Sequence, residues 1–379
     1  MAEPLRVLVV DDSRIFRAAL VEAFQSIPEA RVVESVFSGE KALQVLAERP
    51  VDLVTLDFEM PGMDGLATLQ AIIRFNRERP EQLPVGVVMI SSHTTQGAKT
   101  TIDALKTGAF DFIPKPSGPD AAANKAKLVA ELREKVSAFQ THRTNRLLRR
   151  GLPGPGKPGS GSFPAIPPQP KAAERPSRLV PLGLAAVVVG VSTGGPRALG
   201  TVLPPLVASV SCPIFIVQHM PKGFTASLAE SLARQVPVGV AEASEGEEIS
   251  RQVVRVAPGG KHLVVHRKPN GTLVTTLTED AAECGCRPAA NVLFRSMASA
   301  CGAQVAALVL TGMGQDGTEG AMAIRRVGGL VLAQDEASSV VWGMPGSVVA
   351  AGLADAVAPL EELPGILAEL AKGPRRPQP

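Results

Sequence analysis

Tyrosine is absent from this sequence of 379 residues, and tryptophan occurs only once. Proteins that bind single-stranded nucleic acid stack the bases on aromatic side chains, so this scarcity argues against that class of protein. Cysteine is also scarce, because the sequence holds only Cys212, Cys284, Cys286 and Cys301. None of them forms a Cys-x-x-Cys pair, and the two that are two residues apart are too close for an ordinary zinc half-site. We therefore expect reduced thiols and a cytoplasmic protein.

Long apolar runs are missing as well. The longest, from about Leu179 to Val191, is too short to cross a bilayer, and the N-terminus enters a strand pattern without the apolar core of a signal peptide. We therefore expect no membrane insertion. The net charge of +3 is also uneven, because residues 141–180 contribute +7 and the remaining residues sum to −4. The positive charge therefore belongs to one segment and does not indicate a basic face that binds nucleic acid.

That basic segment also divides the chain. Between Gly151 and Pro176 lie eight prolines and five glycines, with no hydrophobic period, which is typical of an extended linker. We therefore predict a domain over residues 1–140, a Pro/Gly-rich basic linker over 141–180 that begins with a helical tail, and a second domain over 181–379. From about residue 372 onwards we expect a disordered tail.

The first domain alternates strand patterns with helical patterns. Such alternation predicts a parallel sheet covered by helices on both faces, and five repeats fit a flavodoxin-like α/β fold. A longer helical pattern runs from about residue 121 to 140. The predicted strands are 5–10, 31–36, 52–57, 85–91 and 110–114.

Charged and hydroxyl side chains follow these strands at the edge where such sheets carry their sites. Asp11 and Asp12 follow the first strand, Asp57 ends the third, Ser91 ends the fourth and Lys115 follows the fifth. Alone, the aspartate pair would fit a helix N-cap and the lysine an ordinary loop. Together, three carboxylates suit Mg²⁺, and a lysine with a hydroxyl suits phosphoryl oxygens. The pattern therefore predicts phosphoryl transfer to a carboxylate.

The segments 9–13 (VVDDS), 56–65 (LDFEMPGMDG) and 114–116 (PKP) resemble the receiver domain of two-component response regulators. The resemblance covers the whole first domain. It implies that Asp57 accepts a phosphoryl group from a histidine kinase. It also implies a Mg²⁺ site at Asp11, Asp12, Asp57 and the backbone of Glu59, a switch hydroxyl at Ser91 and a phosphate contact at Lys115.

The second domain also shows α/β alternation, and we predict a doubly wound, mostly parallel sheet with a β-hairpin insertion. The turn signal Pro269-Asn270-Gly271 marks the hairpin. Helical patterns are expected at about 289–300, after Gly317 and towards the end. The predicted strands are 184–191, 213–218, 253–256, 262–266, 273–277, 305–311 and 330–334.

Ser192 lies between the first of these strands and a helical pattern, within the stretch 190–196 (GVSTGGP). A serine flanked by glycines on a strand-to-helix turn is typical of a nucleophile elbow, where the hydroxyl projects beside free backbone N–H groups. A plain glycine-rich turn or a phosphate-binding loop would show the same pattern. The serine therefore needs a base and an acid to support the catalytic interpretation.

His219 and Asp316 are the base and acid that we predict. His219 ends a strand directly before Met220-Pro221, and Asp316 lies in a glycine-rich turn after another strand. Both positions fall at the carboxyl edge of the predicted sheet, as Ser192 does. The alternatives for the acid are Asp335 and Asp355. We expect His262 and His266, on a strand-like run, to be surface or hairpin histidines.

The chain order Ser192, His219, Asp316 differs from the order serine, acid, histidine of ordinary α/β-hydrolases. The segments 190–196, 217–221 (VQHMP), 286–294 (CRPAANVLF) and 310–317 (LTGMGQDG) instead resemble chemotaxis protein-glutamate methylesterases, in which a receiver precedes the catalytic domain. The resemblance implies that the three residues form the catalytic triad and that Thr193 and Met313 line the site.

The resemblance also implies the activity. A phosphorylation-regulated serine esterase would release methanol from glutamate methyl esters on methyl-accepting chemoreceptors, and could deamidate receptor glutamines. The receiver would need Mg²⁺ for phosphorylation, whereas the esterase reaction would need no cofactor. Two other classes are weighed against this one. A DNA-binding regulator would need a basic recognition helix, which the second domain lacks, whereas in a non-catalytic scaffold Ser192 would only be a turn residue.

Overall fold

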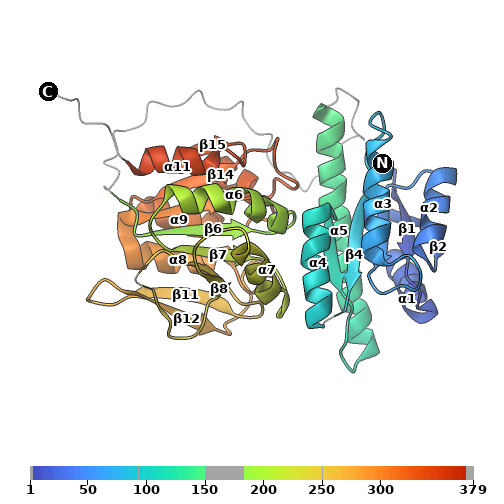
Figure 1. The fold of residues 1–379 in the computed structure, drawn as a ribbon, viewed down its shortest axis with the longest axis horizontal. Coiled ribbons are helices and arrows are strands. Elements are labelled where there is room, and N and C mark those ends of the chain that lie inside the picture. Colours follow the sequence, from blue (N-terminus) through green and yellow to red (C-terminus); the bar gives the residue numbers. More distant parts are fainter. Residues whose placement is uncertain (1–2, 93, 150–182, 250, 373–379) are drawn as a thin grey trace. The chain divides into compact units, whose positions relative to one another are not determined.

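The computed structural model describes residues 3–92, 94–149, 183–249 and 251–372, and the chain divides into two compact units. In the first unit, five parallel strands form one sheet in the order β2-β1-β3-β4-β5. This is the predicted flavodoxin-like arrangement (Figure 1). Its elements are β1 (Leu5–Val10), α1 (Arg14–Phe24), β2 (Ala30–Val36), α2 (Gly39–Glu48), β3 (Leu53–Asp57), α3 (Gly65–Arg77), β4 (Gly86–Ser91), α4 (Thr95–Thr107), β5 (Asp111–Pro114) and α5 (Ala121–Arg149).

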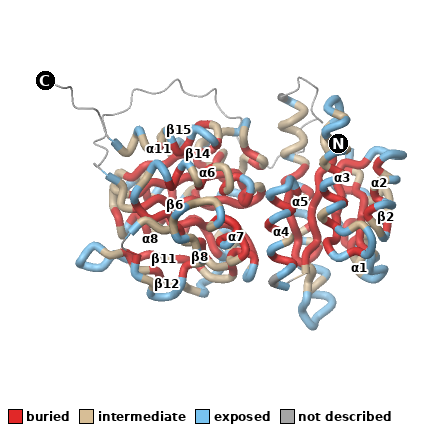
Figure 2. Tube along the Cα trace, viewed as in Figure 1, coloured by how far each residue is buried: buried red, intermediate tan, exposed pale blue. Residues whose placement is uncertain are grey.

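The helices of the first unit form two layers. Helix α1 packs against α5, whereas α3 packs against α2 and α4. Side chains at four helix starts accept hydrogen bonds from backbone N–H groups that lack partners within the helix, which fixes where each helix begins. These residues are Ser13, Ser38, Asp64 and Thr94. Every residue of β3 and β4 is buried, as expected for central strands covered on both faces (Figure 2).

Helix α5 continues beyond the first predicted domain and ends at Arg149. Phe139 and His142 of this helix pack against Phe110, which precedes β5. Arg143 forms an ion pair with Asp52, which precedes β3. The basic helical tail at the start of the predicted linker therefore packs on the first unit. The Pro/Gly-rich part of the linker and the predicted tail from residue 373 lie outside the described residues.

In the second unit, seven parallel strands form a sheet in the order β15-β14-β13-β6-β7-β10-β8. Strand β6 lies at the centre of this sheet, and strands that come later in the chain flank it on both sides. The elements of the second unit are β6 (Ala186–Val191), α6 (Gly195–Ser209), β7 (Ile214–Gln218), α7 (Phe224–Ala233), β8 (Val240–Glu242), β9 (Glu248–Ile249), β10 (Val254–Val256), β11 (His262–Arg267), β12 (Leu273–Thr278), α8 (Ala290–Cys301), the 3₁₀ turn Gly302–Gln304, β13 (Val305–Val309), α9 (Thr318–Arg326), β14 (Leu330–Gln334), α10 (Met344–Ala350), β15 (Ala356–Ala358) and α11 (Leu363–Ala371).

The predicted hairpin is present as β11 and β12, which pair antiparallel and are joined at Asn270 and Gly271. Gly271 has φ +89°, a conformation that glycine adopts without strain, and Asn270 Oδ1 accepts a hydrogen bond from the Thr272 N–H at 3.0 Å. Strand β9 extends this small sheet. Helix α8 contacts both β11 and β6, so its buried side chains fill the space between the hairpin and the large sheet.

None of the described helices is both long enough and apolar enough to span a membrane. Three short strands, β8, β9 and β15, were not predicted from the sequence. Each is two or three residues long, which is too short to establish an alternating hydrophobic pattern.

Candidate active site

Ser192 and His219 lie at the same edge of the large sheet because β6 and β7 are neighbours. Val191 pairs with Gln218 in the sheet, and the His219 N–H donates to the Val191 carbonyl at 3.1 Å. Strand β13 pairs with β6 on its other side, and the turn after β13 carries Asp316. Three adjacent parallel strands therefore bring the three predicted residues to one carboxyl edge, where sites form in open α/β sheets.

The turn that carries Ser192 is fixed by backbone hydrogen bonds. The Ser192 N–H donates to the Thr311 carbonyl at 3.0 Å, and the Ser192 carbonyl accepts from the Gly195 N–H at 2.8 Å. Gly194 has φ +81°, which closes the turn without strain and starts α6. The positive end of the α6 dipole therefore lies beside the serine. Because the Gly195 N–H is engaged within the turn, it is not available to bind an oxyanion.

Gly312 makes room for this turn. A Cβ atom at Gly312 would lie 2.8 Å from Ser192 Cβ and 2.5 Å from Met344 Sδ. Carbon atoms do not approach so closely without displacement, so any side chain at this position would push against the serine. A glycine is therefore required at position 312, because the turn after β13 packs directly on the turn that carries Ser192.

His219 Nε2 lies 2.7 Å from Asp316 Oδ2. Both side chains are nearly buried, with exposed fractions of 10% and 2%. Burial lowers the pKa of His219, but the hydrogen bonds with Asp316 and Cys286 outweigh it and raise the pKa to about 10. The pair therefore favours the charged imidazolium that forms when a serine gives up its proton.

Asp316 is held by the start of α8. Its carboxylate accepts hydrogen bonds from the N–H groups of Ala290 at 2.6 Å, Asn291 at 2.9 Å and Gly317 at 2.8 Å. Burial raises the pKa of Asp316, but the bond to His219 and these backbone bonds lower it below its ordinary value. The carboxylate therefore stays ionised at the positive end of a helix dipole.

The two alternative acids have other partners. Asp335 Oδ1 accepts hydrogen bonds from the N–H and the hydroxyl of Ser338. Asp355 pairs with Arg325 and accepts from the Val331 N–H at 2.9 Å. Asp316 is the carboxylate that contacts His219, so we retain it as the acid of the candidate site.

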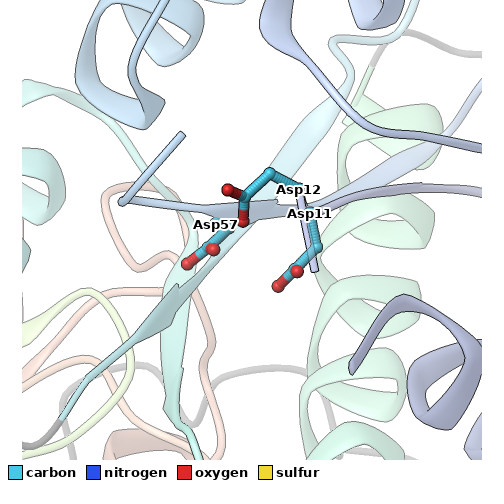
Figure 3. A group of neighbouring side chains, drawn as sticks. All are labelled: Asp11, Asp12 and Asp57. Carbon is cyan, nitrogen blue, oxygen red and sulfur yellow. The ribbon is translucent and has the colours of Figure 1, made fainter. Parts of the chain in front are cut away.

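The predicted site of the first unit is an acidic cluster in which Asp11, Asp12 and Asp57 each offer an oxygen within 4.8 Å of the others. Figure 3 shows their carboxylates at the ends of β1 and β3. Lys115 Nζ donates to Asp57 Oδ2 at 2.8 Å and lies 3.2 Å from Asp11 Oδ2. Burial and the charge of Asp57 raise the pKa of Asp11 to about 6. Crowded carboxylates of this kind fit a hard divalent cation such as Mg²⁺, whose charge would relieve their repulsion.

Ser91 is buried at the end of β4 but turns toward α4. Its hydroxyl accepts a hydrogen bond from Thr101 Oγ1 at 2.7 Å, and none of its hydrogen bonds among the described residues reaches Asp57. Glu59 directs its side chain to Ser92, whose hydroxyl donates to it at 3.0 Å. A switch role for Ser91 therefore requires its hydroxyl proton to turn from the Ser92 and Gly97 carbonyls, to which it now donates, to a phosphoryl oxygen.

Comparisons with known proteins match both units. A model of the response regulator receiver domain matches residues 7–127, and a model of CheB methylesterase matches residues 187–367. A protein-glutamate methylesterase/protein-glutamine glutaminase of Rhodospirillum centenum is 40% identical, over 98% of this chain and 95% of that protein. The chain belongs to the CheB methylesterase family.

Other relatives of this CheB methylesterase family member agree. A protein-glutamate methylesterase/protein-glutamine glutaminase of Nocardioides sp. is 43% identical, over 97% of this chain and 96% of that protein. The Thermotoga maritima CheB methylesterase catalytic domain is 41% identical with a TM-score of 0.48, covering 50% of this chain and 99% of that structure. The two family models and the two full-length relatives confirm the resemblance inferred from the motifs for both halves of the chain.

Sequence reasoning missed several polar residues that support the site in this family member. The Gln218 side chain donates from Nε2 to the Ser192 carbonyl at 3.0 Å. Asn291 Oδ1 accepts from the N–H groups of Gly317 and Gly320 at 3.0 and 2.8 Å, and Cys286 Sγ lies 3.4 Å from His219 Nδ1. Both cysteine and asparagine stood within the 286–294 segment, but their spacing gave no signal of a contact across the fold.

His262 lies on strand β11 of the hairpin, as one of the two alternatives predicted, but the surface alternative was wrong. Its side chain is only 1% exposed, and its Nδ1 accepts a hydrogen bond from the Ala289 N–H at 3.2 Å. Its Nε2 lies 3.1 Å from the Ala281 carbonyl. His262 therefore fastens both ends of the loop that carries Cys286. His266 is exposed, as predicted.

Proposed function

We propose that this chain is a serine esterase that hydrolyses glutamate γ-methyl esters on methyl-accepting chemoreceptors. The observation that carries the proposal is the contact between His219 and Asp316 at the strand edge beside Ser192. The names of the relatives, which are protein-glutamate methylesterases, support this substrate class. The reaction would serve adaptation in chemotaxis-type signalling in the cytoplasm.

In the reaction, the Ser192 oxygen attacks the ester carbonyl while the His219 imidazole takes the hydroxyl proton. Asp316 stabilises the resulting imidazolium. When the tetrahedral intermediate collapses, the ester C–O bond breaks, and His219 returns the proton to the departing methanol. Water then attacks the acyl-enzyme in the same way and releases the glutamate carboxylate. As the family resemblance implies, Thr193 and Met313 would line the site in which the oxyanion develops.

The same residues can hydrolyse a glutamine side-chain amide. The leaving group is then ammonia, which receives its proton from His219 as methanol does. The printed names of the relatives include protein-glutamine glutaminase. We therefore propose deamidation of receptor glutamines as a second reaction of the Ser192 site.

The first unit acts as the control domain, and a histidine kinase supplies the phosphoryl group to Asp57. Asp11, Asp12 and Asp57 would hold Mg²⁺ together with the backbone of Glu59. The ion would neutralise charge on the transferring group. Lys115, already 2.8 Å from Asp57, would bind a phosphoryl oxygen, and the Ser91 hydroxyl would bind another. We propose that the unphosphorylated receiver restrains the esterase and that phosphorylation shifts the population to an open state.

The decisive experiment compares methanol release from methylated receptor membranes by the wild type and by Ser192→Ala. The wild type should release methanol and the variant should not. Equal release by both would favour a scaffold in which Ser192 is only a turn residue. A mobility shift on promoter DNA would instead favour a DNA-binding regulator, and we expect none.

A further inference from the structure

Both ring nitrogens of His219 have a neighbour in the resting site. Nε2 lies 2.7 Å from Asp316 Oδ2, and Nδ1 lies 3.4 Å from Cys286 Sγ. The Ser192 hydroxyl forms no hydrogen bond within the part of the chain that the structure describes. Because Asp316 occupies Nε2, Nδ1 is the nitrogen left to take a proton from Ser192. The thiol therefore stands at the nitrogen that the serine requires.

The loop built around Cys286 is well anchored. Glu283 and Cys286 exchange two backbone hydrogen bonds, at 2.9 and 3.1 Å. The Arg287 carbonyl accepts from the Gly260 N–H at 3.0 Å, and the Arg287 guanidinium donates to the carbonyls of Glu279 and Asp280, directly after β12. The Cys286 side chain is partly exposed to solvent. The thiol is therefore held beside His219 rather than placed there by a loose loop.

We propose that Cys286 is a positioning residue that holds His219 Nδ1 in the resting site and yields it to Ser192 when an ester binds. A thiol suits this role because sulfur forms weak hydrogen bonds, so a hydroxyl oxygen can replace it at little cost. The inference rests on the proposed function, since it assigns a role within the same triad. Cys286 would be a fourth side chain of the site, next to the three that carry out the reaction.

The charges around His219 predict a measurable consequence. Asp316 approaches it from the turn before α9, and Cys286 approaches it from the loop before α8; both contacts raise the pKa of His219. Other charged groups are coupled to these two: Glu283 and Arg295 to Asp316, and Cys284 to both Asp316 and Cys286. Only an unprotonated His219 can accept the serine proton. Removing the thiol should therefore make the base available at lower pH.

The test measures how fast a fluorophosphonate labels Ser192 in the full chain across a range of pH. This probe reports the nucleophile and its base whatever the natural ester is. In the pH profile of the labelling rate, the acid limb for Cys286→Ala should shift to lower pH by about one unit relative to the wild type. Cys286→Ser, which also removes the ionisable sulfur, should shift it in the same direction. Cys284→Ala, which removes a neighbouring thiol that is not hydrogen-bonded to His219, should shift it by much less.

A second measurement uses the wild type itself. Methyl methanethiosulfonate reacts with a thiolate to form an S–S bond and releases methanesulfinate. A methylthio group on Cys286 should block Nδ1 and slow labelling of Ser192 at least tenfold, dithiothreitol should restore it, and Cys286→Ala should resist. An unchanged acid limb in both Cys286 variants would overturn the inference alone. Absence of labelling in the wild type would overturn the proposed function and the inference with it.

Discussion

Asn291 supports Asp316 through both its backbone and its side chain. The Asn291 N–H donates to Asp316 Oδ1 at 2.9 Å, and its side-chain Oδ1 accepts from the N–H of Gly317, the residue next to Asp316, at 3.0 Å. One buried residue thus fixes the acid of the candidate triad and the start of the helix that follows it. The relationship joins α8 to α9, so the geometry of Asp316 depends on the packing of two helices.

Replacing Asn291 by alanine should reduce both stability and activity. The Gly320 N–H, 2.8 Å from Asn291 Oδ1, would lose its acceptor inside the fold. A buried donor left unpaired costs about 1–3 kcal/mol, and we expect the free energy of unfolding to fall by that amount. Urea denaturation measures the stability, and fluorophosphonate labelling of Ser192 measures the site. Asn270→Ala, which removes an exposed turn asparagine, is the control; an equal effect of both variants would contradict the prediction.

Asp316→Asn should leave the fold intact and nearly abolish the esterase. An amide has nearly the same shape as the carboxylate, but it cannot stabilise a charged imidazole and it can favour the wrong tautomer of His219. In serine hydrolases the same change lowers kcat by about 10⁴-fold, and we expect at least 10³-fold here. Methanol release and the melting temperature are measured together. Asp335→Asn, at the aspartate bound to Ser338, should retain activity, and a large loss there would argue for the alternative acid.

Features of the site that depend on residues close together in the sequence could be predicted, whereas contacts between residues far apart in the sequence could not. The turns carrying Ser192, His219 and Asp316 follow strands whose hydrophobic pattern is local, so their place at a sheet edge could be predicted. The helix α8 that holds Asp316 was also predicted, but not its contact with the acid, because that contact depends on tertiary packing. Cys286 and His219 are 67 residues apart in the chain, and no periodicity connects them. Such contacts need the folded structure.

The same distinction applies to His262. Alternation along β11 placed it and His266 on one face of a strand, as the pattern indicated. The sequence does not show that Ala281 and Ala289 return to cover only the first of the two. The burial of His262, at the start of β11, therefore depends on a loop that comes later in the chain and packs over it.

The ion pair between Arg6 and Asp52 should make the first unit sensitive to acid. Burial raises the pKa of Asp52, but the hydrogen bonds from Arg6 and the charge of Arg143 outweigh it, and its pKa lies below the ordinary value. The stabilisation is thus present above about pH 4 and lost as the pH falls through the lower folded pKa. Asp52→Asn should cost about 2 kcal/mol at pH 7 and less at pH 3, measured by urea denaturation. Glu34→Gln, which breaks an exposed pair with Arg49, should cost little at either pH; a pH-independent cost at Asp52 would contradict the assignment.

Gly312→Ala should displace the nucleophile. The added methyl group would meet Met344 Sδ at 2.5 Å and Ser192 Cβ at 2.8 Å, so the turn that carries the serine must move. Such overpacking costs about 1–3 kcal/mol, and a shift of the serine should lower kcat more than tenfold. Methanol release and thermal unfolding report the two effects. Gly365→Ala, in α11 where a Cβ meets nothing within 4 Å, is the control, and wild-type activity in Gly312→Ala would show that the turn tolerates the added atom.

Chelation should separate the two chemistries of the chain. The carboxylates of Asp11 and Asp57 crowd one another, and in the proposed reaction they need a divalent cation before Asp57 can accept a phosphoryl group, whereas the proton transfers proposed for His219 involve only side chains. EDTA should therefore abolish phosphorylation of Asp57 by a small phosphodonor such as acetyl phosphate, while the basal rate of Ser192 labelling persists. Asp11→Asn should weaken Mg²⁺ binding, measured by calorimetry, at least tenfold. Glu22→Gln, at an exposed pair with Lys125, should leave it unchanged. If EDTA also stopped the labelling of Ser192, or if Asp11→Asn bound Mg²⁺ as the wild type does, the assignment of the cation to the acidic cluster alone would be wrong.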